Sequence, residues 1–186
     1  MLVLKAVTNY PDSYLETLAV YRKIADKMLS YDTMLFHGSA IAVDGQAYLF
    51  TAKSGTGKST HTRLWREVFG GRAVMVNDDK PLLKVADSGV TVFGTPWNGK
   101  HRLGENTSAP LKSICILERG ETNEISKINT SDALPKLIQQ MYRSQDHTLL
   151  SKSLELISKL VRRIPIYKLY CNISYDAVNT AYNGMK

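Results

Sequence analysis

Hydrophobic positions along the chain recur at two different spacings, and the change from one spacing to the other marks the predicted elements. Residues 12–30 carry apolar side chains at helical spacing, with Asp12 as the predicted N-cap. Two short apolar runs, residues 39–43 and 47–51, follow and are separated by an Asp-Gly dipeptide, which is a strong signal for a β-hairpin. The pattern therefore predicts one helix followed by a pair of antiparallel strands.

Beyond this hairpin, helical and strand-like patterns are mixed. A helix is predicted from about Ser59 to the Gly-Gly pair at 70–71. Further strands are predicted at 73–77, 81–85, 90–94, 111–119 and 164–170, and further helices at 130–143 and 150–161. Pro135 fits the first turn of its helix if Asp132 is the cap. Hairpins mixed with helices predict an α/β domain with a partly antiparallel sheet rather than a repeating β-α-β chain.

The length and the composition indicate an ordinary globular chain. The 186 residues suit one domain, with 44% apolar and 22% charged residues. No apolar run approaches the roughly 18 residues that a membrane span needs, and the first residues lack a signal-peptide pattern. The two cysteines, Cys115 and Cys171, form no C-x-x-C pair, and Cys115 lies in an apolar run. We therefore expect a cytoplasmic protein with a buried Cys115 and no membrane partner; association with further copies of the chain stays open.

The formal net charge of +7 favours acidic ligands without selecting one. No block of Lys and Arg and no basic-aromatic stripe stands out, so nucleic acid is not a favoured partner. The richest basic cluster, residues 159–163, ends a predicted helix, where cations complement the helix dipole. A partner surface is the alternative for this cluster.

The stretch AKSGTGKST, residues 52–60, is close to the phosphate-binding loop G-x-x-x-x-G-K-[ST]. Ala52 replaces the first glycine, which is a mild departure because that position needs only a small residue. The stretch lies between a predicted strand and a predicted helix, and this is the context that such a loop requires. Its glycines can turn N–H groups toward phosphate oxygens. The predicted nucleotide ligands are Ser54, Gly55, Thr56, Gly57, Lys58, Ser59 and Thr60.

Two residues of this stretch have more specific predicted roles. Lys58 would reach the β- and γ-phosphates, and the hydroxyl of Ser59 would bind Mg²⁺. The predicted cofactors are therefore ATP and Mg²⁺. A glycine-rich turn without a ligand is the alternative.

Two adjacent carboxylates, Asp78 and Asp79, follow the predicted strand at 73–77. A single acid at the end of such a strand commonly holds Mg²⁺ in phosphate-loop enzymes. Two acids can divide the work, one on the metal and one accepting a proton from a hydroxyl group. In extended geometry their side chains diverge, which suits two roles. A solvated turn is the alternative.

The stretch HGSAIAVDGQAYLFTAKSGTGKST, followed by VMVNDD, resembles the catalytic domain of HPr kinase/phosphorylase and, more remotely, the nucleotide site of phosphoenolpyruvate carboxykinase. Both have a phosphate loop of the S-G-x-G-K-[ST] type after a hairpin and an Asp-Asp pair at the end of the next strand. HPr kinases also have a His-Gly pair shortly before the hairpin, which His37-Gly38 matches. The resemblance is specific over residues 36–80 and loose from there to about residue 125.

The resemblance implies a P-loop nucleotide-binding domain of the HPr kinase and phosphoenolpyruvate carboxykinase type, with a mixed, partly antiparallel sheet flanked by helices. Residues 1–186 would form one such domain. It would comprise an N-terminal helical segment (1–35), a nucleotide-binding core (36–125), and C-terminal helices with the last strand (126–186).

By the same resemblance, Asp79 is the expected metal ligand and Asp78 the catalytic acid or base, although the two could be exchanged. His37 would approach the transferred phosphate or the acid pair. The chain also departs from the family: it has Thr60 where HPr kinases have Glu, and it lacks their separate N-terminal domain and a recognisable phosphorylase signature. These departures argue against the protein HPr as the substrate.

The segment GTPWNGKHRLGEN, residues 94–106, is rich in glycine and polar residues. Its cations Lys100 and Arg102 could contact a γ-phosphate or an anionic substrate. The glycines would let the segment move and close over the phosphates, with Trp97 as an anchor or a substrate-facing ring. A surface loop with a docked tryptophan is the alternative. His61, just after the phosphate loop, is expected to be structural or solvent-facing.

The preferred function is a small Mg²⁺-dependent kinase related to HPr kinase, which transfers the γ-phosphoryl group of ATP to a hydroxyl of a protein, peptide or small molecule. The alternative is a nucleotide-binding regulatory module, an ATP or GTP switch without transfer activity. A carboxykinase fits less well, because the chain is short and shows no oxaloacetate site. The sequence does not identify the acceptor.

Overall fold

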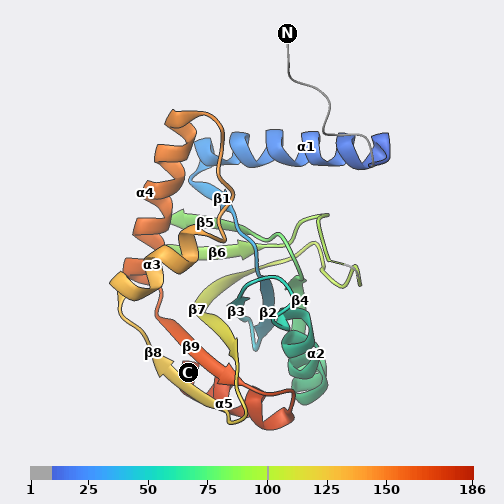
Figure 1. Ribbon diagram of the computed structural model, residues 1–186, viewed down its shortest axis with the longest axis vertical. Coiled ribbons are helices and arrows are strands. Elements are labelled where there is room, and N and C mark those ends of the chain that lie inside the picture. Colours follow the sequence, from blue (N-terminus) through green and yellow to red (C-terminus); the bar gives the residue numbers. More distant parts are fainter. Residues whose placement is uncertain (1–9, 100) are drawn as a thin grey trace.

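The computed structural model describes residues 10–99 and 101–186 and is built around one curled, mixed β-sheet (Figure 1). The strands are β1 (Thr33–Leu35), β2 (Ser39–Val43), β3 (Gln46–Thr51), β4 (Ala73–Asn77), β5 (Leu82–Ala86), β6 (Gly89–Phe93), β7 (Ser108–Arg119), β8 (Glu124–Lys127) and β9 (Ile166–Cys171). The helices are α1 (Asp12–Met28), α2 (Lys58–Phe69), α3 (Thr130–Ile138), α4 (His147–Arg163) and α5 (Tyr175–Met185). Short 3₁₀ turns, Leu29–Tyr31 and Gly70–Arg72, follow α1 and α2.

Strand β7 is the centre of the sheet. The strand order is β1-β5-β6-β7-β3-β2-β4, with β9 beside β7 and β8 beside β9. The first part of β7 pairs antiparallel with β6, and its later part pairs in parallel with both β3 and β9. Hairpins β2–β3 and β5–β6 are antiparallel. The sheet is therefore partly antiparallel within an α/β domain, as the sequence pattern predicted.

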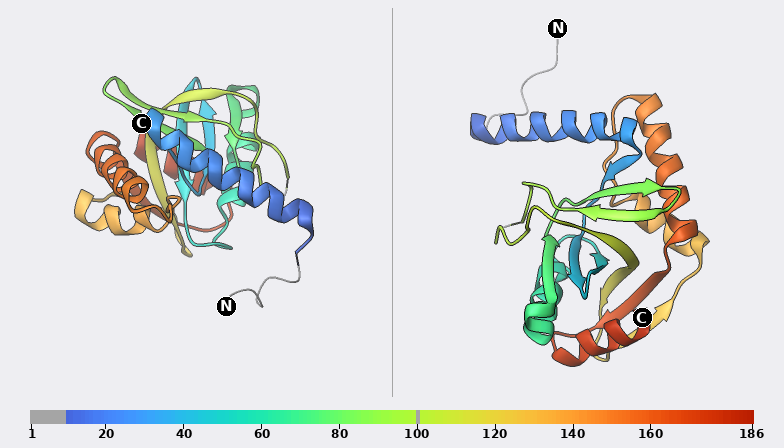
Figure 2. Two further views of the ribbon diagram at one scale, coloured as in Figure 1. Left: turned by 90° about the horizontal axis from the view of Figure 1, so that it is seen from above. Right: turned by 180° about the vertical axis from the view of Figure 1, so that it is seen from behind.

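Helices cover both faces of the central strands, and this explains why β2 and β3 read as continuous apolar runs. Along β3, Ala47 and Leu49 belong to one hydrophobic cluster, whereas Tyr48 and Phe50 belong to another, because side chains alternate between faces. The first cluster lies under α3 and α4, and the second lies under α2 and α5. Figure 2 shows α3 and α4 on one side of the sheet and α2 on the other.

Helix α1 stands apart from this arrangement. It crosses one end of the molecule, and only Ala25 among its residues is buried (Figures 1 and 2). No helix in the described part of the chain is long and apolar enough to cross a membrane.

Several local predictions need correction. Helix α1 begins after Pro11, so Asp12 is its first residue and not its N-cap. The cap of α3 is Asn129, whose side chain accepts a hydrogen bond from the Asp132 N–H, so Pro135 lies beyond the first turn. The predicted helix at 130–143 ends at Ile138, after which the chain pairs with the end of β1.

Three further elements were not predicted. Strand β1 is only three residues long, and β8 is mostly exposed and polar. Helix α5 contains asparagine, threonine and glycine, which are weak helix formers, so its helical pattern is faint. Each of these elements is stabilised by contacts with distant parts of the chain: β1 with β5, and α5 with α2 and β8.

Candidate functional site

The glycine-rich loop, residues 52–57, connects β3 to α2. Gly55 and Gly57 have φ angles of 79° and 121°, a region of backbone conformation that side chains rarely adopt. Gly57 is the N-cap of α2, and no side chain caps the helix there. The first N–H groups of α2 therefore keep their capacity to bind an anion.

Lys58 is the first residue of α2 and folds back over the loop. Its Nζ donates a hydrogen bond to the Ala52 carbonyl at 3.1 Å. Burial lowers the pKa of Lys58, the Asp79 carboxylate opposes this shift, Lys80 adds to it, and Asp78 again opposes it. The lysine at the start of the helix thus lies within electrostatic reach of both aspartates.

The other predicted loop residues surround this lysine. Ser54, Gly55 and Ser59 are exposed, and Thr56, Gly57 and Thr60 are half-buried. All of them are accessible to a ligand.

Asp78 and Asp79 occupy different environments. Asp78 is only 6% exposed, and its Oδ1 accepts a hydrogen bond from Ser39 Oγ. Ser39 Oγ is also 3.1 Å from Thr62 Oγ1 on α2, and Thr62 donates to the Ser59 carbonyl at 3.3 Å. A chain of polar contacts therefore connects the Asp78 carboxylate to the first turn of α2.

Asp79 faces a second cluster, formed with His37 and Lys80. Its Oδ1 lies 3.0 Å from His37 Nδ1 and 3.4 Å from Lys80 Nζ. Burial raises the pKa of Asp79, but the hydrogen bond from His37 and the charge of Lys80 outweigh burial, so the pKa is lowered overall. Asp79 is therefore held as an ionised carboxylate.

His37 and Lys80 also contact each other, with 3.0 Å between His37 Nδ1 and Lys80 Nζ. One ring nitrogen cannot donate to Asp79 and accept from Lys80 at the same time, so the two contacts belong to ring forms with and without a proton on Nδ1. The carbonyl of His37 accepts a hydrogen bond from Thr51 Oγ1 at 3.0 Å, which ties this cluster to the end of β3. The sequence analysis did not predict Lys80 as a site residue, because a lysine before a proline is typical of a solvated turn.

The segment between β6 and β7 packs on the acid pair. Asn77 Nδ2 donates to the Thr95 carbonyl at 3.2 Å, to Thr95 Oγ1 at 3.0 Å and to Asn98 Oδ1 at 2.9 Å. A side chain at Gly99 would meet the backbone oxygen of Asp78 at 3.1 Å. The end of β4 and this segment therefore form one structure.

The glycines of this segment have a different role from the freedom of movement that the sequence suggested. A Cβ atom at Gly94 would lie 2.0 Å from the Glu105 carbonyl oxygen, and one at Gly104 would lie 1.9 Å from Asn98 Oδ1. Gly94 needs to be glycine because backbone atoms approach it so closely, whereas a side chain at Gly104 would displace the Asn98 amide. The glycines thus allow tight packing.

Arg102 and Trp97 lie beside Asp79 and not beside the glycine-rich loop. Arg102 is exposed, has a φ of 48°, and lines a hollow together with Asp79, Lys80 and Trp97. The Trp97 ring contacts Tyr21 of α1 edge-on, with 5.4 Å between ring centroids. Lys100, the other predicted cation, lies outside the described residues.

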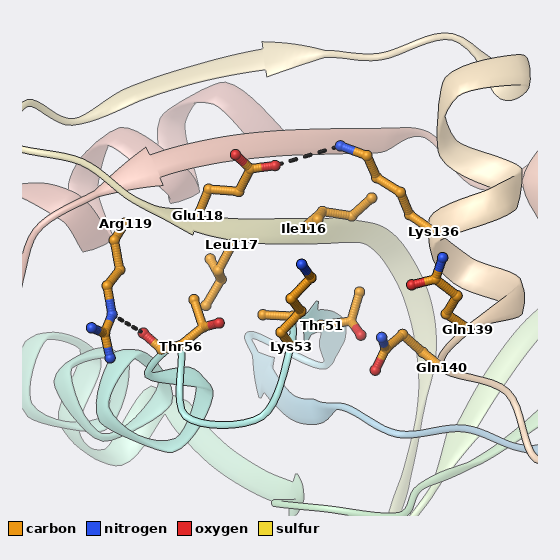
Figure 3. Close-up of a pocket in the computed structure, with 11 residues that line it drawn as sticks. Thr51, Lys53, Thr56, Ile116, Leu117, Glu118, Arg119, Lys136, Gln139 and Gln140 are labelled. Carbon is orange, nitrogen blue, oxygen red and sulfur yellow. Dashed lines mark hydrogen bonds and ion pairs between the residues drawn. The ribbon is translucent and has the colours of Figure 1, made fainter.

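Arg119, at the end of β7, is a residue that the sequence reasoning missed. Its guanidinium donates to the Gly55 carbonyl at 2.6 Å and to the Thr56 carbonyl at 3.5 Å. Figure 3 shows the contact with Thr56. Because β7 runs parallel to β3, with Ile116 opposite Thr51, the two strands end next to each other. Arg119 therefore reaches the loop that follows β3.

Arg119 also lines two hollows beside the loop. One, of about 560 Å³, lies between the loop, β7 and α3, with Lys53, Lys136, Gln139 and Gln140 around it (Figure 3). The other, of about 590 Å³, extends along α2 past Thr60 and Leu64 to Ile173. Both volumes are within the range of small-molecule sites, so the loop has room for a ligand on either side.

Within residues 10–99 and 101–186, no group of three or more His, Cys, Asp and Glu side chains could hold a metal ion by itself. This arrangement still fits Mg²⁺, because that ion commonly takes one or two carboxylates and completes its shell with substrate phosphates and water. Asp78 and Ser59, connected through Ser39 and Thr62, are of the required oxygen-donor type.

The chain was compared with known proteins. No curated protein sequence matches it. A solved structure, the Hpr(Ser) kinase/phosphatase from Coxiella burnetii, is similar over 80% of this chain and 94% of its own chain, at 11% identity and a TM-score of 0.42. A similarity of that degree says nothing about the activity or the ligands of this chain. The family model that matches is not that of HPr kinase. It is "SynChlorMet cassette protein ScmC", which covers residues 4–177, and the chain therefore belongs to the ScmC family.

Proposed function

We propose that the chain is a Mg²⁺-dependent kinase that transfers the γ-phosphoryl group of ATP to a hydroxyl group of an acceptor. The observation that carries this proposal is the combination of a glycine-rich loop, the uncapped start of α2, and Lys58 within electrostatic reach of two carboxylates. N–H groups at a helix start and a lysine bind phosphates, while carboxylates hold Mg²⁺ or accept a proton. The sequence resemblance of residues 36–80 to HPr kinases points to the same chemistry.

On the donor side, the loop and the first turn of α2 would bind the phosphates of ATP. The N–H groups near Gly55 and Gly57 and the Ser59 and Thr60 hydroxyls are accessible for this purpose. Lys58 would exchange its hydrogen bond with Ala52 for one with a phosphate oxygen. That exchange replaces a neutral acceptor with a charged one, which makes a stronger hydrogen bond.

The geometry favours an exchange of the two aspartate roles that the resemblance suggested. Asp78 is almost fully buried and connects through Ser39 and Thr62 to the turn that holds Ser59. Asp79 is more accessible and contacts His37. We therefore assign Asp78 to the Mg²⁺ side, with Ser59, and Asp79 to the acceptor hydroxyl.

In this assignment, His37 and Lys80 hold the Asp79 carboxylate ionised and oriented. An ionised carboxylate can accept the hydroxyl proton as the acceptor oxygen approaches phosphorus. When bound, Mg²⁺ would neutralise negative charge on the phosphates.

The experiment that tests the proposal is calorimetric titration of the protein with MgATP. Lys58→Ala should weaken the affinity roughly 10- to 100-fold, because a hydrogen bond to a charged group is lost. Lys112→Ala, at an exposed position of β7, is the matched control and should bind as the wild type does. Equal affinity of the Lys58 variant and the wild type would refute the donor site.

A further inference from the structure

The hollow beneath α1, of about 630 Å³, has no role in binding the nucleotide in the function proposed above. It is open to solvent and is lined by Leu18 and Tyr21 of α1, by Trp97 and Arg102, and by Asp79 and Lys80. We propose that this acceptor hollow binds a small hydroxyl-bearing anion with an apolar or aromatic body, and that this molecule is the phosphoryl acceptor. The proposal rests on the proposed kinase function and names the class of its acceptor.

The position of the hollow is the first argument. Among the described residues that line it, none belongs to the glycine-rich loop or to α2, so a nucleotide bound there would leave the hollow free. Asp79 lines the hollow, and its charge also acts on Lys58 at the start of α2. A donor at the loop and an acceptor under α1 would thus meet at Asp79, as a direct transfer requires.

The charges around the hollow are the second argument. Arg102 and Lys80 bring two positive charges, whereas Asp79 is the one carboxylate among the lining residues that the structure describes. Asp79 is already paired with His37 and Lys80, which leaves the Arg102 guanidinium for the ligand. A guanidinium recognises a carboxylate or a phosphate through paired hydrogen bonds. The ligand is therefore an anion.

The aromatic walls are the third argument. Tyr21 packs edge-on against both Trp97 and Tyr142, at centroid distances of 5.4 Å and 5.9 Å, so its ring is held in place. Tyr21 and Asp79 both line the hollow, and burial, and then the Asp79 carboxylate, raise the pKa of Tyr21. Aromatic rings and Leu18 beside two cations suit a ligand with an apolar body and a charged end.

Helix α1 itself is the fourth argument. It lies above the segment between β6 and β7 in the right-hand view of Figure 2, yet only Ala25 of the helix is buried. The volume of about 630 Å³ is within the range of small-molecule sites. The helix thus forms one wall of a small hollow that contains the acid.

The transfer is balanced as follows. The acceptor oxygen forms a bond to the γ-phosphorus while the bond from that phosphorus to the β,γ-bridging oxygen breaks. Asp79 takes the hydroxyl proton and later releases it to water, and ADP leaves with the bond electrons. The products are a phosphate monoester of the acceptor, ADP and one proton.

The test uses three small probes and the fluorescence of Trp97; the other tryptophan, Trp65, is fully buried in the core. The probes are 3-phenyllactate, hydrocinnamate, which lacks the hydroxyl, and 2-phenylethanol, which lacks the carboxylate. The two acids should change the fluorescence saturably, and the alcohol should need a roughly tenfold higher concentration, since its bond to Arg102 is missing. The change should disappear in Trp97→Phe.

Two variants sharpen the test. Arg102→Gln should abolish the preference for the acids over the alcohol, whereas Arg66→Gln, at an exposed position near the end of α2, should retain it. With MgATP present, phosphorus NMR should detect a phosphate monoester with 3-phenyllactate and none with hydrocinnamate, which has no hydroxyl to accept the group.

Binding of the alcohol as tight as that of the acids, no saturable change with any acid, or an unchanged preference in Arg102→Gln would overturn the inference. Phosphorylation of casein without binding of any small acid would also overturn it, in favour of a polypeptide acceptor. Because probe binding is measured without nucleotide, failure of MgATP binding would count against the donor site and not against the hollow.

Discussion

The buried histidine of α2 makes acid stability a sharp test of the structure. His61 is 4% exposed, and its Nε2 accepts a hydrogen bond from Trp65 Nε1 at 3.0 Å. Burial lowers the pKa of His61 from its ordinary value of 6.5 to about 4. The imidazole is therefore neutral in the folded protein near neutral pH, as an acceptor for an indole N–H must be.

The sign of the pH dependence follows from this difference. As the pH falls below 6.5, the unfolded chain protonates this histidine while the folded chain does not, down to a pH of about 4. Since the unfolded state binds more protons in that window, stability decreases as the pH decreases. The shift from 6.5 to about 4 corresponds to a loss of about 2 kcal/mol between about pH 7.5 and about pH 5, and about 3 kcal/mol by about pH 4.

The assay is urea unfolding at about pH 7.5 and at about pH 5, followed by circular dichroism. His61→Gln keeps an oxygen that can accept the hydrogen bond from Trp65, but the glutamine side chain does not titrate. Between about pH 7.5 and about pH 5, the free energy of unfolding of this variant should therefore fall by about 2 kcal/mol less than that of the wild type. His147→Gln, exposed at the start of α4, is the matched control and should follow the wild type. Equal losses in the wild type and His61→Gln, or an NMR titration of His61 with a pKa above about 6, would refute the reasoning.

Three further predictions concern the site. Asp79→Asn should keep MgATP affinity but reduce phosphoryl transfer roughly 10²- to 10⁴-fold, whereas Asp78→Asn should raise the Mg²⁺ concentration needed, as steady-state kinetics would measure. Swapped phenotypes would reverse our assignment, and undiminished transfer in Asp79→Asn with intact binding would remove Asp79 from its proposed role. Arg119→Ala removes the hydrogen bonds to the Gly55 and Thr56 carbonyls, so it should weaken MgATP binding roughly tenfold and speed tryptic cleavage after Lys53. Arg119→Lys should restore part of both effects. Unchanged binding and cleavage would show that these hydrogen bonds do not hold the loop. Asn77→Ala removes the donors to Thr95 and Asn98 and should lower the free energy of unfolding by roughly 1–3 kcal/mol, which urea unfolding would detect as a lower midpoint concentration. An unchanged midpoint would contradict the packing described.

Much of the fold could be read from the sequence where neighbouring residues decide the structure. The β2–β3 hairpin formed where an Asp-Gly dipeptide separated two apolar runs, and α2 started at Lys58, within a residue of the prediction. The prediction for α3 was wrong about its cap and its length, because Asn129 and Asp132 are both plausible caps by residue type and only backbone geometry separates them.

In the candidate site, too, the residues in short contiguous motifs could be predicted from the sequence, and the residues brought together from distant positions could not. The glycine-rich loop and the two aspartates are contiguous motifs, so a short stretch of sequence was enough to single them out. Lys80 and Arg119 belong to no motif, and their contacts with His37 and with the loop span 43 and 64 residues of sequence. A local pattern cannot show which distant residues will meet.

The sequence by itself determined the strand, the glycine-rich loop and the helix of the proposed phosphate site, since these three elements are encoded by consecutive residues, 46–69. Only the tertiary structure decided how those residues are surrounded. The parallel pairing of β7 with β3 brings Arg119 to the loop, and the path of α1 places Leu18 and Tyr21 in the lining of the hollow that contains Asp79. The physical reason is that strand order and helix placement follow from burying apolar faces that lie far apart in the chain, and many different pairings satisfy the same local pattern.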